Sequence, residues 1–217
     1  MGDLLATVGE PERTRVLEAC RPRRFARGTI LFHEGEPGDG LHIVDSGHLV
    51  VRTGLASGDV VTLDVAGPGD VIGEVALVLP DNIRSATVAA LDDCTTLMLS
   101  VPAFHALCEE NPAVATAVAR VLAERVDRLT RQLSEALYVG VDQRVARRTI
   151  RMAGIYGGMV TGTEVPLTQQ DLADLAGATR PTVNQSLKKL EAAGAIELFR
   201  GGVRVADPAA LRRLAGL

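Results

Sequence analysis

Short apolar and alternating runs, separated by glycines, follow one another between Phe25 and Ser100. The runs that are rich in β-forming residues lie about 8 to 15 residues apart, which is typical of short strands joined by turns. They cover residues 41–44, 49–52, 60–65 and 95–99. Turn sequences with proline, glycine and aspartate occur at residues 36–40 and 67–70. This region is therefore predicted to form an antiparallel barrel or sandwich.

The pattern becomes helical after Pro102, with a short helix expected over residues 103–109 and a long one beginning after Pro112. In the long segment apolar residues recur every three or four positions, which predicts one stripe along a helix of about 25 residues. The stripe consists of Val118, Leu122, Val126, Leu129, Leu133 and Leu137. Such a helix would bury its stripe best against a second copy as a parallel two-stranded coil. The alternative is packing on its own barrel.

The last third of the chain predicts a compact helical cluster. A helix is expected over residues 142–153, and a glycine-rich connection follows it. Thr168 and Asp171 form a capping-box pattern before a helix over residues 169–176, with Leu172 and Leu175 turned inward. Gly177 permits a tight turn, and a second helix follows. Helix, turn and helix in this order are typical of a DNA-binding motif, and an ordinary corner of two helices is the alternative.

The second helix of this motif is expected to begin after Thr179, to carry Pro181 in its first turn and to end at Gly194. Its inner face is Val183, Leu187 and Leu190, and its outer face could contact bases and phosphates. The outer residues are Arg180, Thr182, Asn184, Gln185, Lys188 and Lys189. Two β-like runs, 196–199 and 203–206, follow around residues 200–202 and predict a wing that brings Arg200 and Arg204 near phosphates.

The composition fits a folded protein of one large or two small domains, because the chain has 217 residues with 47% hydrophobic and 23% charged residues. The longest apolar runs, such as residues 75–79, are far shorter than the roughly 18 residues of a membrane span. The N-terminus, Met1 to Leu5, lacks the features of a signal peptide. The three cysteines, Cys20, Cys94 and Cys108, are scattered and have no C-x-x-C spacing. This argues against disulfides, zinc sites and iron–sulfur sites, so a reducing cytoplasm is expected.

The net charge of −4 conceals an asymmetry between the two parts of the chain. Residues 1–143 contain 12 basic and 21 acidic residues, whereas residues 144–217 contain 11 basic and 6 acidic ones. The net charges are therefore −9 and +5. A basic C-terminal third suits a polyanionic partner such as nucleic acid.

A second candidate site lies in residues 69–77 and 84–87. Gly73 lets the backbone approach a ligand, and a short helix between Glu74 and Arg84 could bring these two side chains together. Arg84 could hold a phosphate through its fork of donors, while Glu74 accepts a hydrogen bond from a sugar hydroxyl. The alternative is an ordinary ion pair.

The order of these parts, together with Gly73-Glu74 and Arg84-Ser85-Ala86 at this spacing, resembles the cyclic-AMP receptor protein (CRP/FNR) family of bacterial transcription regulators over residues 25–206. The resemblance implies an α+β protein with a cyclic-nucleotide-binding β-roll (1–111), a dimerisation helix and hinge (112–139) and a winged helix-turn-helix domain (140–217). Val139-Gly140 is the candidate hinge. Cyclic AMP is the expected effector and cyclic GMP the alternative. The implied partners are a second copy, a palindromic operator in double-stranded DNA, and RNA polymerase.

The resemblance also assigns roles to individual residues. Glu74 would take the ribose 2′-hydroxyl, Arg84 and Ser85 would bind the cyclic phosphate, and Val51 and Leu63 would line the base pocket. Gly73, Val75 and Ala76 complete the nucleotide cassette, and Thr168, Gln169 and Thr179 join the residues that face DNA. Leu129-Thr130 stands where the cyclic-AMP sensors of the family have a Thr-Ser pair. Arg180 matches the family's guanine-reading arginine, but the glutamate contact of the family is absent.

Other chemistries find little support in the sequence. The histidines, which are His33, His42, His48 and His105, do not have the spacing of metal ligands. Haem sensing would need a cysteine or histidine close to Glu74, and residues 75–77 contain neither. Iron–sulfur sensing would need a cluster of cysteines, which the sequence lacks. No nucleophile-and-base pattern or P-loop suggests an enzyme. Two other hypotheses stay open. One is a regulator of the same architecture that needs no nucleotide, and the other is a nucleotide-binding subunit that docks a protein.

Overall fold

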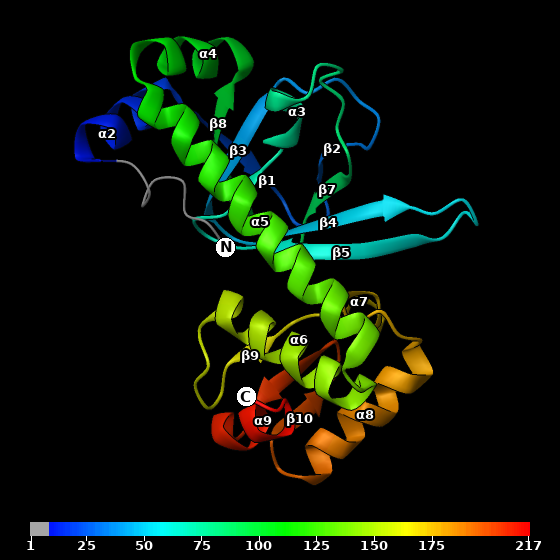
Figure 1. The fold of residues 1–217 in the computed structure, drawn as a ribbon. Helices are drawn as coiled ribbons and strands as arrows, with labels where there is room; N and C mark the ends of the chain where they lie inside the picture. Colours follow the sequence, from blue (N-terminus) through cyan, green and yellow to red (C-terminus); the bar gives the residue numbers. More distant parts are fainter. Residues whose placement is uncertain (1–8) are drawn as a thin grey trace. The chain divides into compact units, whose positions relative to one another are not determined.

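The structure is a computed structural model that describes residues 9–217 (Figure 1). The N-terminal sequence that we examined for a signal peptide lies outside these residues. The chain divides into two compact units, which are described separately. The first extends to Leu129 except for residues 61–63, and the second contains those residues together with Thr130–Leu217.

The first unit is a β-roll of two four-stranded sheets, with strand orders β1-β8-β3-β6 and β2-β7-β4-β5. Its strands are β1 Arg21–Phe25, β2 Ile30–Phe32, β3 Gly40–Ser46, β4 Leu49–Gly54, β5 Val60–Ala66, β6 Val71–Ile72, β7 Thr87–Ala90 and β8 Cys94–Ser100. The β1–β8, β3–β8, β3–β6, β2–β7 and β4–β7 pairs are antiparallel, as in the pairing of Leu41 with Leu99 between β3 and β8. The predicted antiparallel sandwich and its four predicted strands are confirmed as β3, β4, β5 and β8.

The side-chain alternation of β3 divides the roll into two apolar cores. Leu41 and Ile43 face a core formed with helices, whereas Val44 faces the space between the two sheets. The core between the two sheets also contains Phe32, Val51 and further apolar residues of both sheets. Because successive side chains of a strand point to opposite faces, one strand serves both cores.

Among residues 9–217, the helices that accompany the roll are α2 Glu10–Ala19, α3 Val75–Val78, α4 Val101–Glu110 and α5 Pro112–Tyr138. The first half of α5 is buried in the core that the roll forms with its helices, through Val114, Ala117, Val118 and Val121. Farther along the helix the apolar stripe is exposed, at Val126, Leu129, Leu133 and Leu137. The stripe therefore packs on its own roll at one end and leaves an apolar surface at the other.

The second unit contains a winged helix-turn-helix head. Its elements are α6 Val141–Tyr156, β9 Glu164–Val165, α7 Gln169–Ala176, α8 Arg180–Ala192, β10 Ile196–Phe199, β11 Gly202–Val205 and α9 Pro208–Leu214. The predicted wing is confirmed, and β9 adds a third strand to it in the order β10-β11-β9. The roll, the long helix and this head confirm the predicted fold class.

The boundary between the units falls within α5, before the predicted hinge at Val139-Gly140. The last turns of α5 are fastened to α6 by Glu135, which forms ion pairs with Arg147 at 3.1 Å and Arg148 at 2.9 Å. Arg144 also donates to the carbonyl oxygen of Val139 at 2.8 Å. These contacts join the end of the long helix to the head. Within residues 9–217, no helix has the length and apolar content of a membrane span.

Candidate functional site

Gly73 and Glu74 stand between β6 and α3, and the short helix α3 precedes the loop that returns the chain to Arg84. Both charged side chains are buried in the roll, Glu74 at 0% and Arg84 at 2% exposure. They line one cavity together with Phe32, Val51 and other apolar residues. The predicted approach of Glu74 and Arg84 through a short helix is therefore present.

The Arg84 guanidinium is held from several sides. Its Nη2 donates to Asp39 Oδ1 at 2.6 Å, its Nη1 donates to the carbonyl oxygen of Gly73 at 3.1 Å, and its Cζ lies 4.1 Å from the centre of the Phe32 ring. Nε is buried and has no hydrogen-bond partner among the described residues. Burial lowers the pKa of Arg84, and the Asp39 carboxylate opposes that shift. The group therefore offers a partly desolvated positive charge to an anion.

Gly73 has to be a glycine for two reasons. Its φ of +86° is unfavourable for residues with a Cβ, and a Cβ at this position would overlap Arg84 Nη1. The same hypothetical atom would lie 3.2 Å from the carbonyl oxygen of Gly40. The backbone at Gly73 thus leaves the space that the guanidinium fills.

The Glu74 carboxylate is half satisfied. Oε1 forms a short ion pair with Arg125 of α5, whereas Oε2 is buried without a hydrogen-bond partner anywhere in residues 9–217. A buried carboxylate oxygen without a donor is costly. A ligand hydroxyl that donated to Oε2 would remove this cost.

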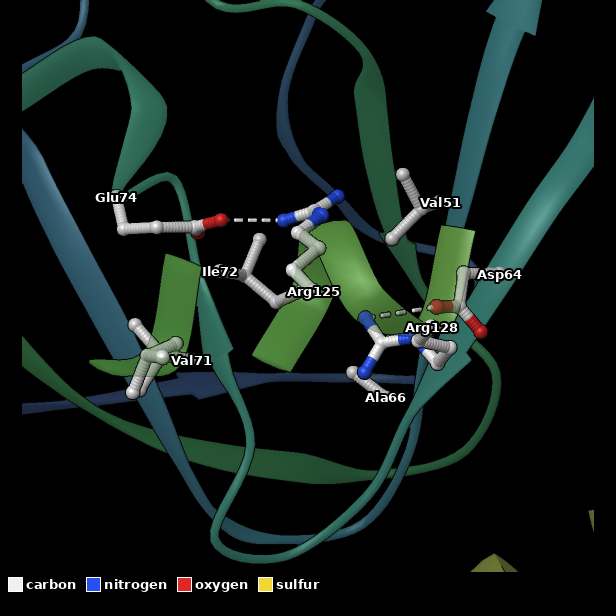
Figure 2. A pocket seen from close by; sticks show the side chains of 9 residues that line it. Val51, Asp64, Ala66, Val71, Ile72, Glu74, Arg125 and Arg128 are labelled. Atoms are coloured by element: carbon white, nitrogen blue, oxygen red, sulfur yellow. Dashed lines mark hydrogen bonds and ion pairs between the residues drawn. The ribbon is translucent and has the colours of Figure 1, made fainter. Parts of the chain in front are cut away.

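A second cavity adjoins the first (Figure 2). The two cavities share Val51, Ile72, Glu74 and Arg125. Figure 2 also shows Arg128 of α5 reaching toward Asp64 of β5, with Nη2 and Oδ2 3.6 Å apart. Three charged residues thus line the cavity beside Glu74, namely Asp64, Arg125 and Arg128.

The sequence reasoning missed these three residues. Arg125 and Arg128 lie on the long helix outside its predicted apolar stripe, and no site role is predicted for them from the sequence. Their spacing of three, which places both on one side of α5, was the available signal. Asp64 carried another signal, since it is the one charged residue in the strand run 60–65.

Most of the predicted nucleotide residues line the first cavity: Val51, Gly73, Glu74, Val75, Ala76, Arg84 and Ser85. Leu63 is not among the lining residues of either cavity and is 47% exposed. Side chains alternate along β5, so the face that carries Asp64 and Ala66 into the second cavity excludes Leu63. Leu129 is half-exposed on α5, one turn after Arg125, and Thr130 follows it.

The histidine nearest to this site has a structural environment. His42 is buried, its Nδ1 lies 2.9 Å from Thr96 Oγ1, and its ring packs against Phe25 and Phe32. Burial and the nearby Arg84 lower the pKa of His42 to about 4, so the ring is neutral at pH 7. No cluster of three metal-ligating side chains occurs in the described part of the chain.

The helix-turn-helix of the head follows its predicted local chemistry. Thr168 and Asp171 form both hydrogen bonds of the capping box, and Gly177 ends α7 in the left-handed conformation. Thr179 caps α8 by accepting from the amide of Thr182 at 3.4 Å. Val183, Leu187 and Leu190 are buried. The predicted orientation of α8 is thereby fixed by its apolar face.

The predicted DNA contacts occupy two kinds of position in the head. Thr168, Gln169, Arg180 and Arg200 line one groove between the starts of α7 and α8 and the wing. The other outer residues of α8 are exposed or half-exposed: Thr182, Asn184, Gln185, Lys188 and Lys189. These groups include the donors and acceptors that read base edges and contact phosphates.

Two of the predicted phosphate contacts already have acidic partners. Lys189 Nζ lies 2.7 Å from Asp142 Oδ2. Arg204 pairs with Glu164 at 2.7 Å and with Glu197 at 3.0 Å, and these hydrogen bonds raise its pKa. Arg180 and Arg200 have no ion pair assigned within residues 9–217, which makes them the more accessible cations.

Comparisons with known proteins agree with this geometry. Residues 22–111 match the cyclic nucleotide-binding domain, and residues 143–214 match the Crp-like helix-turn-helix domain. The chain is 30% identical to the CRP-like cAMP-activated global transcriptional regulator of Mycobacterium tuberculosis, over 99% of this chain and all of that protein. It is 32% identical to the cyclic AMP receptor protein of Thermus thermophilus, over 89% and 87% of the two chains.

A solved structure gives the same result. The crystal structure of a CRP-family transcriptional regulator from Thermus thermophilus superposes with a TM-score of 0.75 at 26% identity, covering 90% of this chain and 97% of that one. The roll, the head and their order along the chain are thus shared with regulators of one kind. This chain belongs to the CRP/FNR family of transcription regulators.

Proposed function

We propose that this chain is a homodimeric transcription regulator whose binding to DNA is controlled by a 3′,5′-cyclic purine nucleotide in the roll. In this proposal the protein acts on a palindromic operator in the bacterial cytoplasm, contacts RNA polymerase and catalyses no reaction. Arg84 and Ser85 hold the cyclic phosphate, and Glu74 takes the ribose 2′-hydroxyl.

The observation that carries the nucleotide half is the incomplete hydrogen bonding of Glu74 and Arg84. Each has one buried polar atom without a hydrogen-bond partner in the described chain, and both side chains line the same cavity. Arg84 Nε is a donor and Glu74 Oε2 an acceptor. A cyclic nucleotide supplies the matching acceptor on its phosphate and the matching donor on its ribose.

The names of the relatives support the same effector class. The Mycobacterium tuberculosis and Thermus thermophilus proteins are both named for cyclic AMP. Cyclic AMP is therefore the first nucleotide to test on this chain, with cyclic GMP beside it.

The exposed part of the α5 stripe supports the homodimer. Val126, Leu129, Leu133 and Leu137 are between 53% and 66% exposed and repeat every three or four residues. An apolar seam of this period is buried when two copies pack as a parallel coil. The same seam would place two heads on two half-sites of an operator, about one turn of DNA apart.

A population shift connects the nucleotide to the heads. Arg125 of α5 contacts Glu74, so a ligand on Glu74 changes a contact of the long helix. The other end of α5 is tied to α6 through Glu135. A nucleotide that binds one arrangement of the long helices more tightly increases its population, and the heads follow it.

Calorimetry with cyclic AMP and cyclic GMP tests the nucleotide half. We expect Arg84→Leu to abolish binding, because the phosphate loses its buried guanidinium. Arg24→Leu, which removes an exposed arginine of β1, should bind as the unaltered protein does. Thermal unfolding of both variants shows whether the roll stays folded. Equal affinity of the Arg84 variant and the unaltered protein would remove the assignment.

Operator selection followed by gel shifts tests the DNA half. Arg180→Ala should weaken binding to the selected operator by roughly 1–3 kcal/mol. Arg212→Ala removes an exposed arginine of α9 and serves as the matched control. If the Arg180 variant loses as much affinity for random DNA as for the operator, this residue contacts phosphate and reads no base.

A second candidate is a regulator of the same architecture that needs no nucleotide. The observation in its favour is that both buried charges already have an opposite charge beside them, Arg125 for Glu74 and Asp39 for Arg84. In that case neither cyclic nucleotide gives a calorimetric signal, and the affinity for the operator is the same with and without them.

A further inference from the structure

The Asp64–Arg128 pair lies where the base of a bound nucleotide would be. Arg84 and Ser85 line only the first cavity, Asp64 and Arg128 only the second, and Glu74 lines both. In a cyclic nucleotide the ribose joins the phosphate to the base. If Arg84 holds the phosphate and Glu74 the ribose, the base extends into the second cavity.

This second cavity has apolar walls and, besides Glu74 and Arg125, the charged pair of Asp64 and Arg128. Val51, Ala66 and Val71 supply apolar surface for the faces of a purine (Figure 2). The side chains of Asp64 and Arg128 are 13% and 17% exposed, so both charges lie largely out of water. Asp64 Oδ1 accepts from the amide of Val65 at 2.8 Å, which fixes the orientation of the carboxylate.

The two charged groups lie close to each other. Arg128 Nη2 and Asp64 Oδ2 are 3.6 Å apart, beyond the usual length of a hydrogen bond. A planar ligand edge that offers donors to the carboxylate and acceptors to the guanidinium would engage both groups with shorter contacts.

We propose that Asp64 and Arg128 read the base and select guanine, so that a 3′,5′-cyclic guanine nucleotide is the preferred effector; this assignment depends on the nucleotide site proposed above. Guanine presents two adjacent donors, N1–H and the 2-amino group, to a carboxylate. It presents O6 and N7 as acceptors to an arginine fork. The pair therefore has a partner for each of its groups on one base.

Adenine matches the same pair poorly. Its N1 is an acceptor and would face the acceptor oxygens of Asp64, and its 6-amino group is a donor placed where the Arg128 fork needs an acceptor. A bidentate contact to the correct base gives about tenfold to a hundredfold discrimination. The adenine nucleotide in the names of the relatives is thus the less favoured ligand here.

Calorimetry with cyclic GMP, cyclic AMP and cyclic IMP tests this inference on the full chain. The unaltered protein should bind cyclic GMP at least tenfold more tightly than cyclic AMP. Cyclic IMP, which lacks the 2-amino group, should bind with intermediate affinity. Asp64→Asn should lose the preference for guanine, because an amide offers the donor and acceptor that adenine matches. Asp45→Asn, which changes an exposed aspartate of β3, should keep the preference of the unaltered protein.

The outcomes separate this inference from the proposed function. Binding of both nucleotides with equal affinity, or a preference for cyclic AMP, overturns the base assignment and leaves the nucleotide site standing. An equal loss of both affinities in Asp64→Asn also overturns it, since the pair then only fastens α5 to β5. Absence of binding by all three nucleotides overturns the site and the base assignment together. If a variant fails to fold, the ratio of the affinities of the unaltered protein for cyclic GMP and cyclic AMP still tests the base assignment.

Discussion

Replacing Gly73 by alanine tests the geometry of the phosphate end directly. Gly73 and Gly58 have nearly the same backbone conformation, with φ of +86° and +89°. A Cβ at Gly58 would meet no atom of the described residues within 4 Å, whereas a Cβ at Gly73 would overlap Arg84 Nη1. Gly58→Ala is therefore a matched control, because it adds the same backbone strain without the collision.

The expected losses in free energy of unfolding follow from the backbone strain and from the collision with Arg84. An alanine in the left-handed region costs about 1–2 kcal/mol, and both variants should lose this much free energy of unfolding. Gly73→Ala also displaces Arg84 from its hydrogen bonds to Gly73 and Asp39. A hydrogen bond to a charged group contributes about 1.5–3 kcal/mol, so the loss of both bonds together with the strain should cost the Gly73 variant roughly 4–8 kcal/mol in total.

Urea denaturation and calorimetry with cyclic nucleotide measure the two effects. Only Gly73→Ala should lose nucleotide affinity, by tenfold or more, because only there does the guanidinium move. If both variants are equally destabilised and Gly73→Ala binds nucleotide like the unaltered protein, then Arg84 does not depend on the space beside Gly73. The account of the phosphate end given above would then be wrong.

Three other predictions concern separate parts of the chain. Burial raises the pKa of Asp70 to about 6 from 3.8. Asp70 therefore stabilises the fold fully below pH 3.8 and loses this contribution as the pH rises through 6. In urea titrations the stability advantage of Asp70→Asn over the unaltered protein should grow by up to about 3 kcal/mol between pH 4 and 7, and a constant difference would contradict this. Glu135→Gln should lower the free energy of unfolding by about 2–3 kcal/mol in the same assay, because Arg148 is 8% exposed and loses its charged partner. Glu164→Gln removes a charge from an exposed pair and should change the stability little. Equal effects of the two variants would argue against the role of burial. Leu133→Asp should yield monomers in sedimentation velocity, because it places a charge in the exposed stripe; a variant that sediments as a dimer would exclude this seam as the interface.

The sequence predicted those parts of the fold whose signals are local. The capping box at Thr168, the left-handed turn at Gly177 and the apolar face of α8 each depend on a few neighbouring residues, and the structure has all three. The strand β1 was missed because its sequence, Arg-Pro-Arg-Arg-Phe, has no alternation. It pairs with β8 at the edge of a sheet, where a proline is tolerated.

The candidate site divides in the same way. Glu74 and Arg84 are ten residues apart and are joined by a short helix, so their approach could be predicted from the chain. Arg125 and Arg128 enter the site because the first half of α5 lies along the roll, and that placement depends on distant packing contacts. Leu63 was misplaced because the alternation along β5 was not used to decide which residues face inward.

The carboxylate of Asp39 is the resident counterion of Arg84 and is itself 73% exposed. In the proposed site an incoming phosphate would therefore exchange with an anion of the protein. The affinity of such a site reflects the difference between two anions competing for one guanidinium, and the released carboxylate returns to water at small cost. Inorganic anions that make fewer contacts than a nucleotide would gain little from the same exchange, so we expect the resident carboxylate to disfavour their binding.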